Sequence, residues 1–174
     1  VANATVLYKP HPKVTTSPHS EIANAHKKIL DLLDSANAKD PSAKHKLVTG
    51  DPMPVLQVAD LLVSDVSAVT IDYLYLKPQG AMLMCDRRSN VTEFAQVAPV
   101  SKAVTVITKD NINSIDKLIS DHVSGQVDRT SYDSMRNYYF GDTKPGSSIN
   151  RFIAMVDDLI KRRDKKVLEL PTSK

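Results

Sequence analysis

The stretch Leu61-Leu62-Val63-Ser64-Asp65-Val66-Ser67 decides the fold that we expect for this chain. Its first three residues form an apolar run and the next two are polar, as in a buried parallel strand that ends at the carboxyl edge of a sheet. Residues 67–76 follow with apolar side chains at Val69, Tyr73 and Leu76, a spacing that predicts a helix. A buried strand that leads directly into a helix is the repeating unit of a parallel α/β sheet.

The same alternation of short apolar runs and helical segments continues along the chain. Runs bounded by proline, glycine or polar residues predict four further strands, at residues 5–8, 47–49, 81–85 and 104–107. Helical spacing of apolar residues predicts helices at residues 20–36, 54–59, 112–123, 132–139 and 147–163, with Ser20 as the N-cap of the first. We therefore expect an α/β fold: a Rossmann-like, three-layer αβα domain with a mainly parallel sheet of about five strands.

Length and composition indicate one globular domain. The chain has 174 residues, of which 41% are hydrophobic and 25% charged, enough to form one hydrophobic core. We assign residues 1–164 to this domain and residues 165–174 to a polar C-terminal tail, and we expect a piece of a longer polypeptide. The formal net charge of +3 suits a phosphate-bearing ligand without indicating nucleic acid, and we expect no nucleic-acid partner.

Nothing in the sequence indicates a metal site, a disulfide or a membrane span. Cys85 is the only cysteine and lies in an apolar run, which favours a buried strand position and a reducing compartment. The histidines are scattered without metal-ligand spacing, and no apolar stretch approaches the roughly 20 residues that span a bilayer. The basic run at residues 162–166 suits a solvated helix end, with a membrane-surface contact as the alternative. We expect neither a metal nor a cofactor.

Three groups of polar residues follow predicted strands, where parallel sheets bind their ligands. They lie at residues 9–12, 64–67 and 86–88. The hydroxyls of Ser64 and Ser67, together with free amides at the start of the next helix, are suited to bind phosphate. Capping of that helix by Asp65 or Ser67 explains the same residue types equally well.

His11 and the residues around Ser147 are further candidates. His11 lies between two prolines on a stiff loop, where an imidazole can donate to a phosphate oxygen or transfer a proton; a surface histidine without a role fits the same spacing. Ser147 or Ser148 would cap the last helix, with Arg151 one turn further on, and a capped loop without a ligand is the alternative. We interpret the remaining histidines as solvated or structural: His19, His26, His45 and His122.

Taken in order, these residues resemble a known family. Three segments are similar to the C-terminal half of the CDP-glycerol glycerophosphotransferases, the bacterial teichoic-acid primases and polymerases: residues 8–12 (Tyr-Lys-Pro-His-Pro), residues 59–69, and Asp72-Tyr73 with Lys77-Pro78. That family has a His-Pro pair after a strand and, later, an Ala-Asp-x-Leu-Ile-(Ser/Thr)-Asp-Tyr-Ser-Ser block. A looser likeness to its C-terminal Asp-Gly loop involves Asp142, Gly146, Ser147, Ser148 and Arg151. The resemblance runs from about residue 5 to residue 158.

The resemblance implies a transferase of the GT-B arrangement, in which two Rossmann-like domains face a cleft and the C-terminal one holds the donor. By this resemblance His11 lies near the donor pyrophosphate, as the catalytic histidine of this half. The donor would be CDP-glycerol or a related nucleotide-activated compound, which is a substrate and not a cofactor. The residues implied in binding the donor and its phosphates are Ser64, Asp65, Ser67, Asp72, Ser147, Ser148 and Arg151.

The resemblance also implies the rest of the reaction. Glycerol phosphate, or a similar polyol phosphate, would pass to a membrane-anchored cell-wall polymer, with release of CMP. The enzyme would be cytoplasmic and peripheral at the inner face of the cell membrane. This half, which lacks the N-terminal half of the same chain, would be inactive alone.

Some positions depart from the family pattern and leave alternatives open. Val66 stands where the family has tyrosine, Ala68 where it has a second serine, and residues 86–88 (Asp-Arg-Arg) replace an aspartate-then-tyrosine segment. Another polyol or nucleotide could therefore be the activated group. The alternatives are a nucleotide-sugar glycosyltransferase or UDP-sugar epimerase domain, for which a Gly-rich turn is missing, and a non-catalytic nucleotide-binding module.

Overall fold

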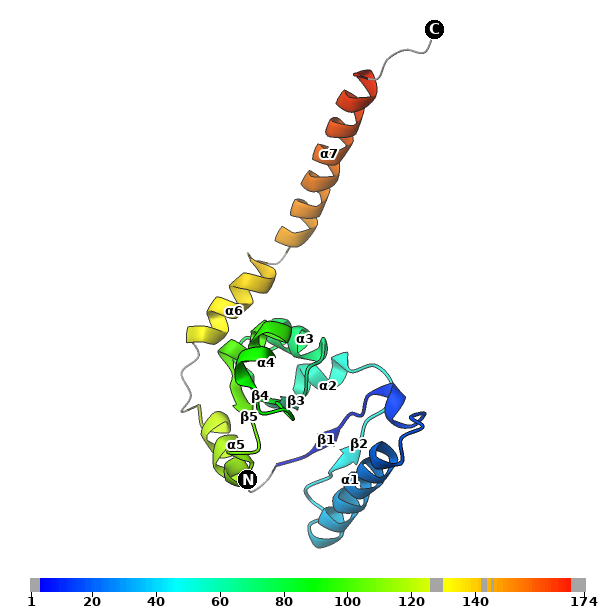
Figure 1. Cartoon of the computed structure of the whole chain (residues 1–174), viewed down its shortest axis with the longest axis vertical. Coiled ribbons are helices and arrows are strands. Elements are labelled where there is room, and N and C mark those ends of the chain that lie inside the picture. The colour runs from blue at the N-terminus through cyan, green and yellow to red at the C-terminus, as the bar shows by residue number, and fades with distance from the viewer. Residues whose placement is uncertain (1–3, 126–129, 142–143, 145, 170–174) are drawn as a thin grey trace.

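The computed structural model describes residues 4–125, 130–141, 144 and 146–169, and within them the chain is an α/β structure (Figure 1). The strands are β1 (Leu7–Tyr8), β2 (Lys46–Leu47), β3 (Leu61–Ser64), β4 (Ala81–Cys85) and β5 (Thr105–Ile107). The α-helices are α1 (Ser20–Lys39), α2 (Met53–Val58), α3 (Val69–Leu76), α4 (Val91–Val97), α5 (Ile115–Val123), α6 (Thr130–Phe140) and α7 (Ser147–Leu168). Short 3₁₀ helices are η1 (Pro12–Val14), η2 (Pro99–Ala103) and η3 (Ile112–Ser114).

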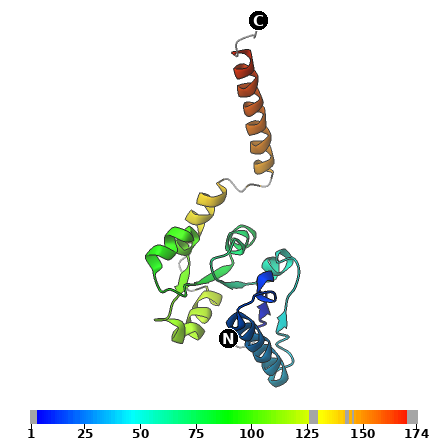
Figure 2. The same cartoon turned by 45° about the vertical axis from the view of Figure 1, so that its right-hand side comes forward.

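All described strands are parallel, as the sequence predicts, but they form two sheets. β1 pairs with β2, while β4 lies between β3 and β5. The expected number of five strands and their parallel direction are confirmed, but the strands do not form one continuous sheet. β1 and β2 are two residues long and pair only with each other among the described strands, apart from the three-stranded sheet (Figure 2). Val6, just before β1, and Val63 of β3 are 48% and 47% exposed.

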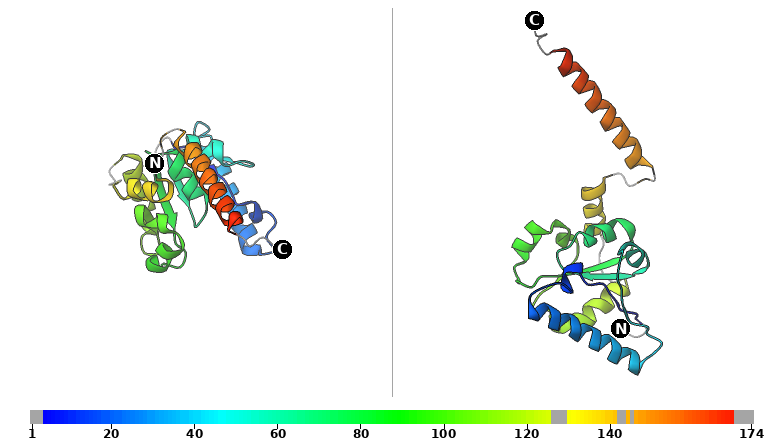
Figure 3. Two further views of the ribbon diagram at one scale, coloured as in Figure 1. Left: turned by 90° about the horizontal axis from the view of Figure 1, so that it is seen from above. Right: turned by 90° about the vertical axis from the view of Figure 1, so that its right-hand side faces the viewer.

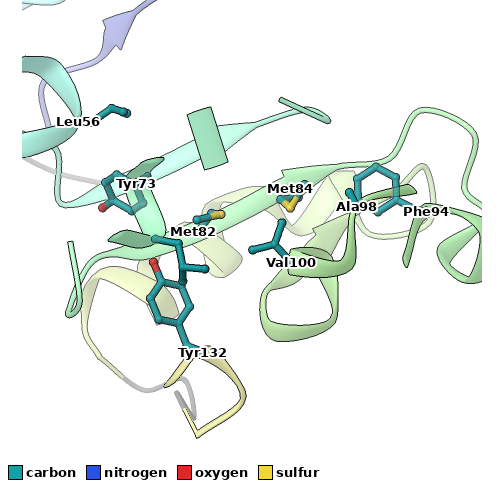
Figure 4. Packing of buried hydrophobic residues seen from close by; sticks show 9 residues of the cluster. Leu56, Tyr73, Met82, Met84, Phe94, Ala98, Val100 and Tyr132 are labelled. Atoms are coloured by element: carbon teal, nitrogen blue, oxygen red, sulfur yellow. The ribbon is translucent and has the colours of Figure 1, made fainter. Parts of the chain in front are cut away.

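The hydrophobic core lies on one face of the three-stranded sheet (Figure 4). Because side chains alternate along a strand, Met82 and Met84 of β4 point to this face, under α3, α4, η2 and α6. α5 contacts β4 from the other side of the sheet. The buried hydrophobic cluster consists of Leu56, Tyr73, Leu74, Met82, Met84, Phe94, Ala98, Val100 and Tyr132.

Two contacts fix α3 against this core. The Tyr73 hydroxyl donates to the carbonyl oxygen of Ala59 at 3.1 Å, which ties the helix to the segment before β3. Gly80, buried just before β4, lies so close to the Tyr73 ring and to Lys77 that a Cβ there would overlap both. Glycine is therefore needed for close packing at this position, because its lack of a side chain lets the tyrosine approach.

α7 stands away from the rest of the described chain (Figures 1 and 2). None of its residues is buried, and its exposed large hydrophobic residues include Ile149, Phe152, Ile153, Leu159 and Ile160. It runs to Leu168, so the polar tail that we expected from residue 165 is helical for its first four residues; residues 170–174 lie outside the described part. No described helix is both long and apolar enough to cross a membrane.

Candidate functional site

Ser64 and Asp65 lie where the sequence places them, at the carboxyl end of β3. Ser64 is the last residue of the strand and pairs in register with Met84 of β4. Its hydroxyl makes no hydrogen bond to another described residue, and Asp65 next to it is exposed. The end of this strand therefore presents one free hydroxyl and one carboxylate.

Ser67 takes part in starting α3 and still offers a donor. Its Oγ accepts a hydrogen bond from the Val69 N–H at 3.3 Å, and its carbonyl accepts one from the Thr70 hydroxyl at 2.6 Å. The capping interpretation thus holds for Ser67, whereas Ala68 occupies the N-cap position itself. An accepting hydroxyl keeps its own proton, so Ser67 remains able to donate to a ligand.

Two backbone donors lie in front of the same helix. The N–H groups of Ser67 and Ala68 make no hydrogen bond to another residue in the described part of the chain. Unpaired amides at a helix start, with the positive end of the helix dipole behind them, favour an anion. Together with the Ser64 and Ser67 hydroxyls, they give this turn four neutral donors for phosphate.

Asp72 lies in the first turn of α3 and is partly buried. A carboxylate there interacts favourably with the helix dipole, which accounts for the residue type without a ligand. Its carboxylate makes no hydrogen bond or ion pair with another described residue. A role in donor binding stays a prediction for this residue.

His11 is exposed and precedes η1, where its ring caps the turn. The ring Nδ1 accepts a hydrogen bond from the N–H of Lys13 at 3.1 Å. A neutral imidazole that accepts at Nδ1 carries its proton on Nε2. His11 is therefore set to donate a hydrogen bond outward, as a phosphate ligand requires.

The other described histidines that make hydrogen bonds have structural partners, as expected. The ring of His26 bonds the Tyr8 hydroxyl at 3.0 Å, and His45 Nδ1 accepts from the Val6 N–H at 2.9 Å. His122 is buried, and its Nδ1 bonds the Leu118 carbonyl at 2.7 Å. The first two contacts hold the β1 segment to α1 and to the residue before β2. The His122 contact lies within the C-terminal part of α5.

The structure brings two of the three groups that follow strands to one sheet edge, residues 64–67 after β3 and residues 86–88 after β4. It places His11 and the residues around Ser147 elsewhere. His11 follows β1 in the two-stranded sheet, and residues 64–67 follow β3 in the other sheet. Ser147, Ser148 and Arg151 lie at the start of α7, which Figure 3 shows beyond the body of the chain. The single edge that we expected required one continuous sheet, and the short β1 pairs only with β2 in the described chain.

The N-cap expected for the last helix is also different. Gly146, with φ 80°, occupies the N-cap position of α7, and Ser147 and Ser148 are the first two helical residues. Glycine suits this left-handed backbone because it has no Cβ. Likewise α1 begins at Ser20 and is preceded by His19, so Ser20 is not its cap. Asp142, part of the same sequence likeness, lies outside the described residues.

Sequence reasoning placed Asp86 in a polar group at the ligand edge, and the structure shows that its carboxylate organises the loop after β4. Asp86 is buried and its carboxylate accepts hydrogen bonds from two backbone N–H groups. Beside it, burial raises the pKa of the Cys85 thiol, and the negative charge of Asp65 raises it further. The register of β3 and β4, with Ser64 opposite Met84, places Asp65 beside Cys85. The sequence signal that could have indicated this role is the spacing of Asp86, four residues before Asn90, which caps α4.

The candidate residues lie on open surface. Two cavities in the described chain, of about 350 and 540 Å³, are lined by none of them. The described part also contains no group of three or more His, Cys, Asp or Glu side chains arranged to hold a metal ion.

Residues 2–139 match the model of the CDP-glycerol:poly(glycerophosphate) glycerophosphotransferase family. The chain belongs to this family. No curated protein and no solved structure gives a significant match. The matched range includes His11 and residues 64–72 and ends before Ser147. This glycerophosphotransferase assignment therefore covers all three groups that follow strands, at residues 9–12, 64–67 and 86–88, and supports a transferase over a module without activity.

Proposed function

We propose that this glycerophosphotransferase domain binds a CDP-activated polyol phosphate, with CDP-glycerol as the first choice, at the turn after β3. The observation that carries this proposal is the set of four unpaired donors there: the hydroxyls of Ser64 and Ser67 and the N–H groups of Ser67 and Ala68. The family match supports the chemical class of the transferred group.

The reaction requires little more than positioning and charge stabilisation. A hydroxyl of the acceptor polymer would attack the β-phosphorus of the donor. A P–O bond forms, the bond between the β-phosphorus and the CMP oxygen breaks, CMP leaves with the electron pair, and the proton of the acceptor hydroxyl passes to the solvent. Donors aimed at the phosphate oxygens stabilise the charge that develops during such a transfer. The amides and hydroxyls of the turn suit this role.

His11 would bind the leaving phosphate through Nε2–H, the nitrogen that its bond to the Lys13 amide leaves protonated. This needs the end of β1 to lie near the end of β3. In a sheet of order β2-β1-β3-β4-β5, β1 and β3 would be neighbours at the point where the strand order reverses. His11 and Ser64 would then lie at the ends of neighbouring strands. Open α/β sheets bind ligands at that point, and the exposed apolar residues Val6 and Val63 favour closing the gap.

A second domain would complete the site. The turn after β3 lies on open surface, whereas transfer to a polymer hydroxyl competes with water unless the site is closed. We therefore propose a GT-B arrangement, with a second Rossmann-like domain of the same enzyme as the opposite wall. Ser147, Ser148, Arg151 and Asp72 are proposed donor ligands in that closed form.

α7 supports a location at the membrane surface. It carries exposed apolar residues along its length and the basic residues Arg162, Arg163, Lys165 and Lys166 near its end. Amphipathic helices of this kind lie in the interface of anionic bilayers, and the proposed acceptor is membrane-anchored. Co-sedimentation with vesicles containing phosphatidylglycerol tests this, and equal sedimentation after removal of α7 would rule it out.

CMP release by the full enzyme tests the proposed site. We expect His11→Ala to lower turnover by about 100-fold, the usual scale for a charge-stabilising donor. Replacing both Ser64 and Ser67 by Ala should raise the KM for CDP-glycerol. His19→Ala is the matched control, because His19 is another exposed histidine after β1. Unchanged turnover with His11→Ala would remove His11 from the site.

A further inference from the structure

One buried carboxylate holds the loop that follows β4. Asp86 is 4% exposed, and its carboxylate oxygens accept hydrogen bonds from the N–H groups of Arg88 (3.0 Å) and Asn90 (2.7 Å). The N–H of Asp86 donates to the Ile107 carbonyl of β5 at 2.8 Å. The loop is thereby shaped before any ligand binds.

Neighbouring segments hold the same loop from outside. The hydroxyl of Ser89 accepts a hydrogen bond from the Lys109 N–H at 3.2 Å, which joins the loop to the segment after β5. Asn90 caps α4 by accepting from the Glu93 N–H at 3.2 Å. A loop fixed at this many points loses little conformational entropy when it binds a ligand.

The two arginines of this loop differ in their partners. Arg88 pairs with Glu93, with 2.9 Å between Nη1 and Oε1. Arg87 is exposed and makes no hydrogen bond or ion pair with another residue of the described ranges. Its guanidinium is therefore free on a preformed loop.

Arg87 emerges at the same sheet edge as residues 64–67. β3 and β4 are parallel neighbours, with Ser64 opposite Met84, so the residues that follow both strands leave the sheet at one end. The turn after β3 supplies neutral donors and the negative charge of Asp65. A diphosphate bound there needs a full positive charge from a neighbouring segment.

We propose that Arg87 is a specificity-determining residue that binds a phosphate group of the nucleoside diphosphate donor at the turn after β3. This inference rests on the proposed function. The planar guanidinium can donate to two phosphate oxygens at once, which a lysine ammonium cannot do in the same geometry. Arg87 lies in the segment 86–88, which replaces the aspartate-then-tyrosine segment of the family. Donor recognition at this position would therefore differ between this chain and the family pattern.

Calorimetric titration with CDP tests Arg87 against two controls that remove the same charge. Arg87→Ala should weaken CDP binding roughly 10- to 100-fold, the scale of a charge-assisted bidentate contact, and Arg87→Lys should restore only part of it. Arg88→Ala and Lys109→Ala should change the affinity for CDP less than about threefold, as expected for exposed charges that do not contact the bound phosphate. Equal losses in all three alanine variants would overturn the proposal.

A second titration separates the two sources of phosphate in this reaction. It replaces CDP by a short glycerol phosphate oligomer, which represents the acceptor. Weakened oligomer binding with unchanged CDP binding in Arg87→Ala would overturn the proposal. If the wild type binds CDP and Arg87→Ala binds it equally well, only the Arg87 inference is contradicted. If the wild type binds neither CDP nor CDP-glycerol, the proposed function is contradicted.

Discussion

At the scale of single residues, Ser67 combines two uses that sequence patterns treat as alternatives. Its oxygen accepts from the N–H of Val69 at the start of α3, while its proton stays free for an outside acceptor. Its own backbone N–H has no partner in the described chain. Helix capping and anion binding therefore do not exclude each other here, because they use different atoms of one residue.

Cys85 reports on the position of Asp65. Burial and the Asp65 charge both raise the pKa of this thiol. A smaller fraction of it is therefore in the reactive thiolate form at pH 8 than in an ordinary cysteine. We expect alkylation by iodoacetamide to be slow, and Asp65→Asn to speed it by about twofold or more. Asp72→Asn is the control, since it removes the same charge from α3 instead of from the end of β3. Equal rates in the wild type and Asp65→Asn would place Asp65 away from β4.

Residue identity allowed the strand-end positions of Ser64 and Asp65 to be predicted, because an apolar run followed by polar residues marks the end of a buried strand. The bond from Lys13 N–H to His11 Nδ1 and the role of Asp86 were not predictable in this way. Both depend on a particular loop geometry, which composition and spacing do not specify.

At the scale of elements, Gly80 shows how close packing depends on an absent side chain. We expect Gly80→Ala to destabilise the chain by about 1–3 kcal/mol, because the new methyl group would overlap Tyr73 and Lys77. Urea unfolding measures the change. Tyr73→Phe removes the overlapping hydroxyl, so the double variant should lose less than the sum of the single losses. Strictly additive losses would show that the Tyr73 hydroxyl is not the group that the new methyl displaces.

α7 should fold and unfold independently of the core, since none of its residues is buried. A chain that ends at Gly141 is expected to keep the free energy of unfolding of the core within about 0.5 kcal/mol, the usual range for changes away from buried contacts, so its thermal midpoint should hardly change. Far-UV circular dichroism during thermal unfolding measures both the lost helix signal and the midpoint. A large fall in the midpoint would mean that α7 packs on the core.

Strong periodicity made most elements predictable, and weak periodicity accounts for the misses. The helices at residues 20–36, 112–123 and 147–163 carried clear apolar spacing, and each appears within a few residues of its expected bounds. α4 was missed because its seven residues bury only Phe94. Its start depends on the Asn90 cap, a side-chain contact that apolar spacing does not detect.

At the scale of the whole molecule, the arrangement of the strands was less predictable than their number. Parallel direction followed from the strand–helix alternation, but the pairing of β1 only with β2 did not. Two-residue strands supply few ladder hydrogen bonds, so their position depends on packing that spans the whole chain. As a result, His11 and Ser64 belong to the ends of strands in different sheets.

Binding of a CDP-activated donor by this glycerophosphotransferase domain is the proposal on which the site and the reaction rest. Thermal unfolding with CDP-glycerol, CMP, CTP and UDP-glucose tests it most directly, because a ligand that binds only the folded chain adds about 2.7 kcal/mol of stability at 100 times its Kd. We predict a rise in Tm of several degrees with CDP-glycerol, a smaller rise with CMP, and none with UDP-glucose. A rise with UDP-glucose and none with the cytidine compounds would contradict the account.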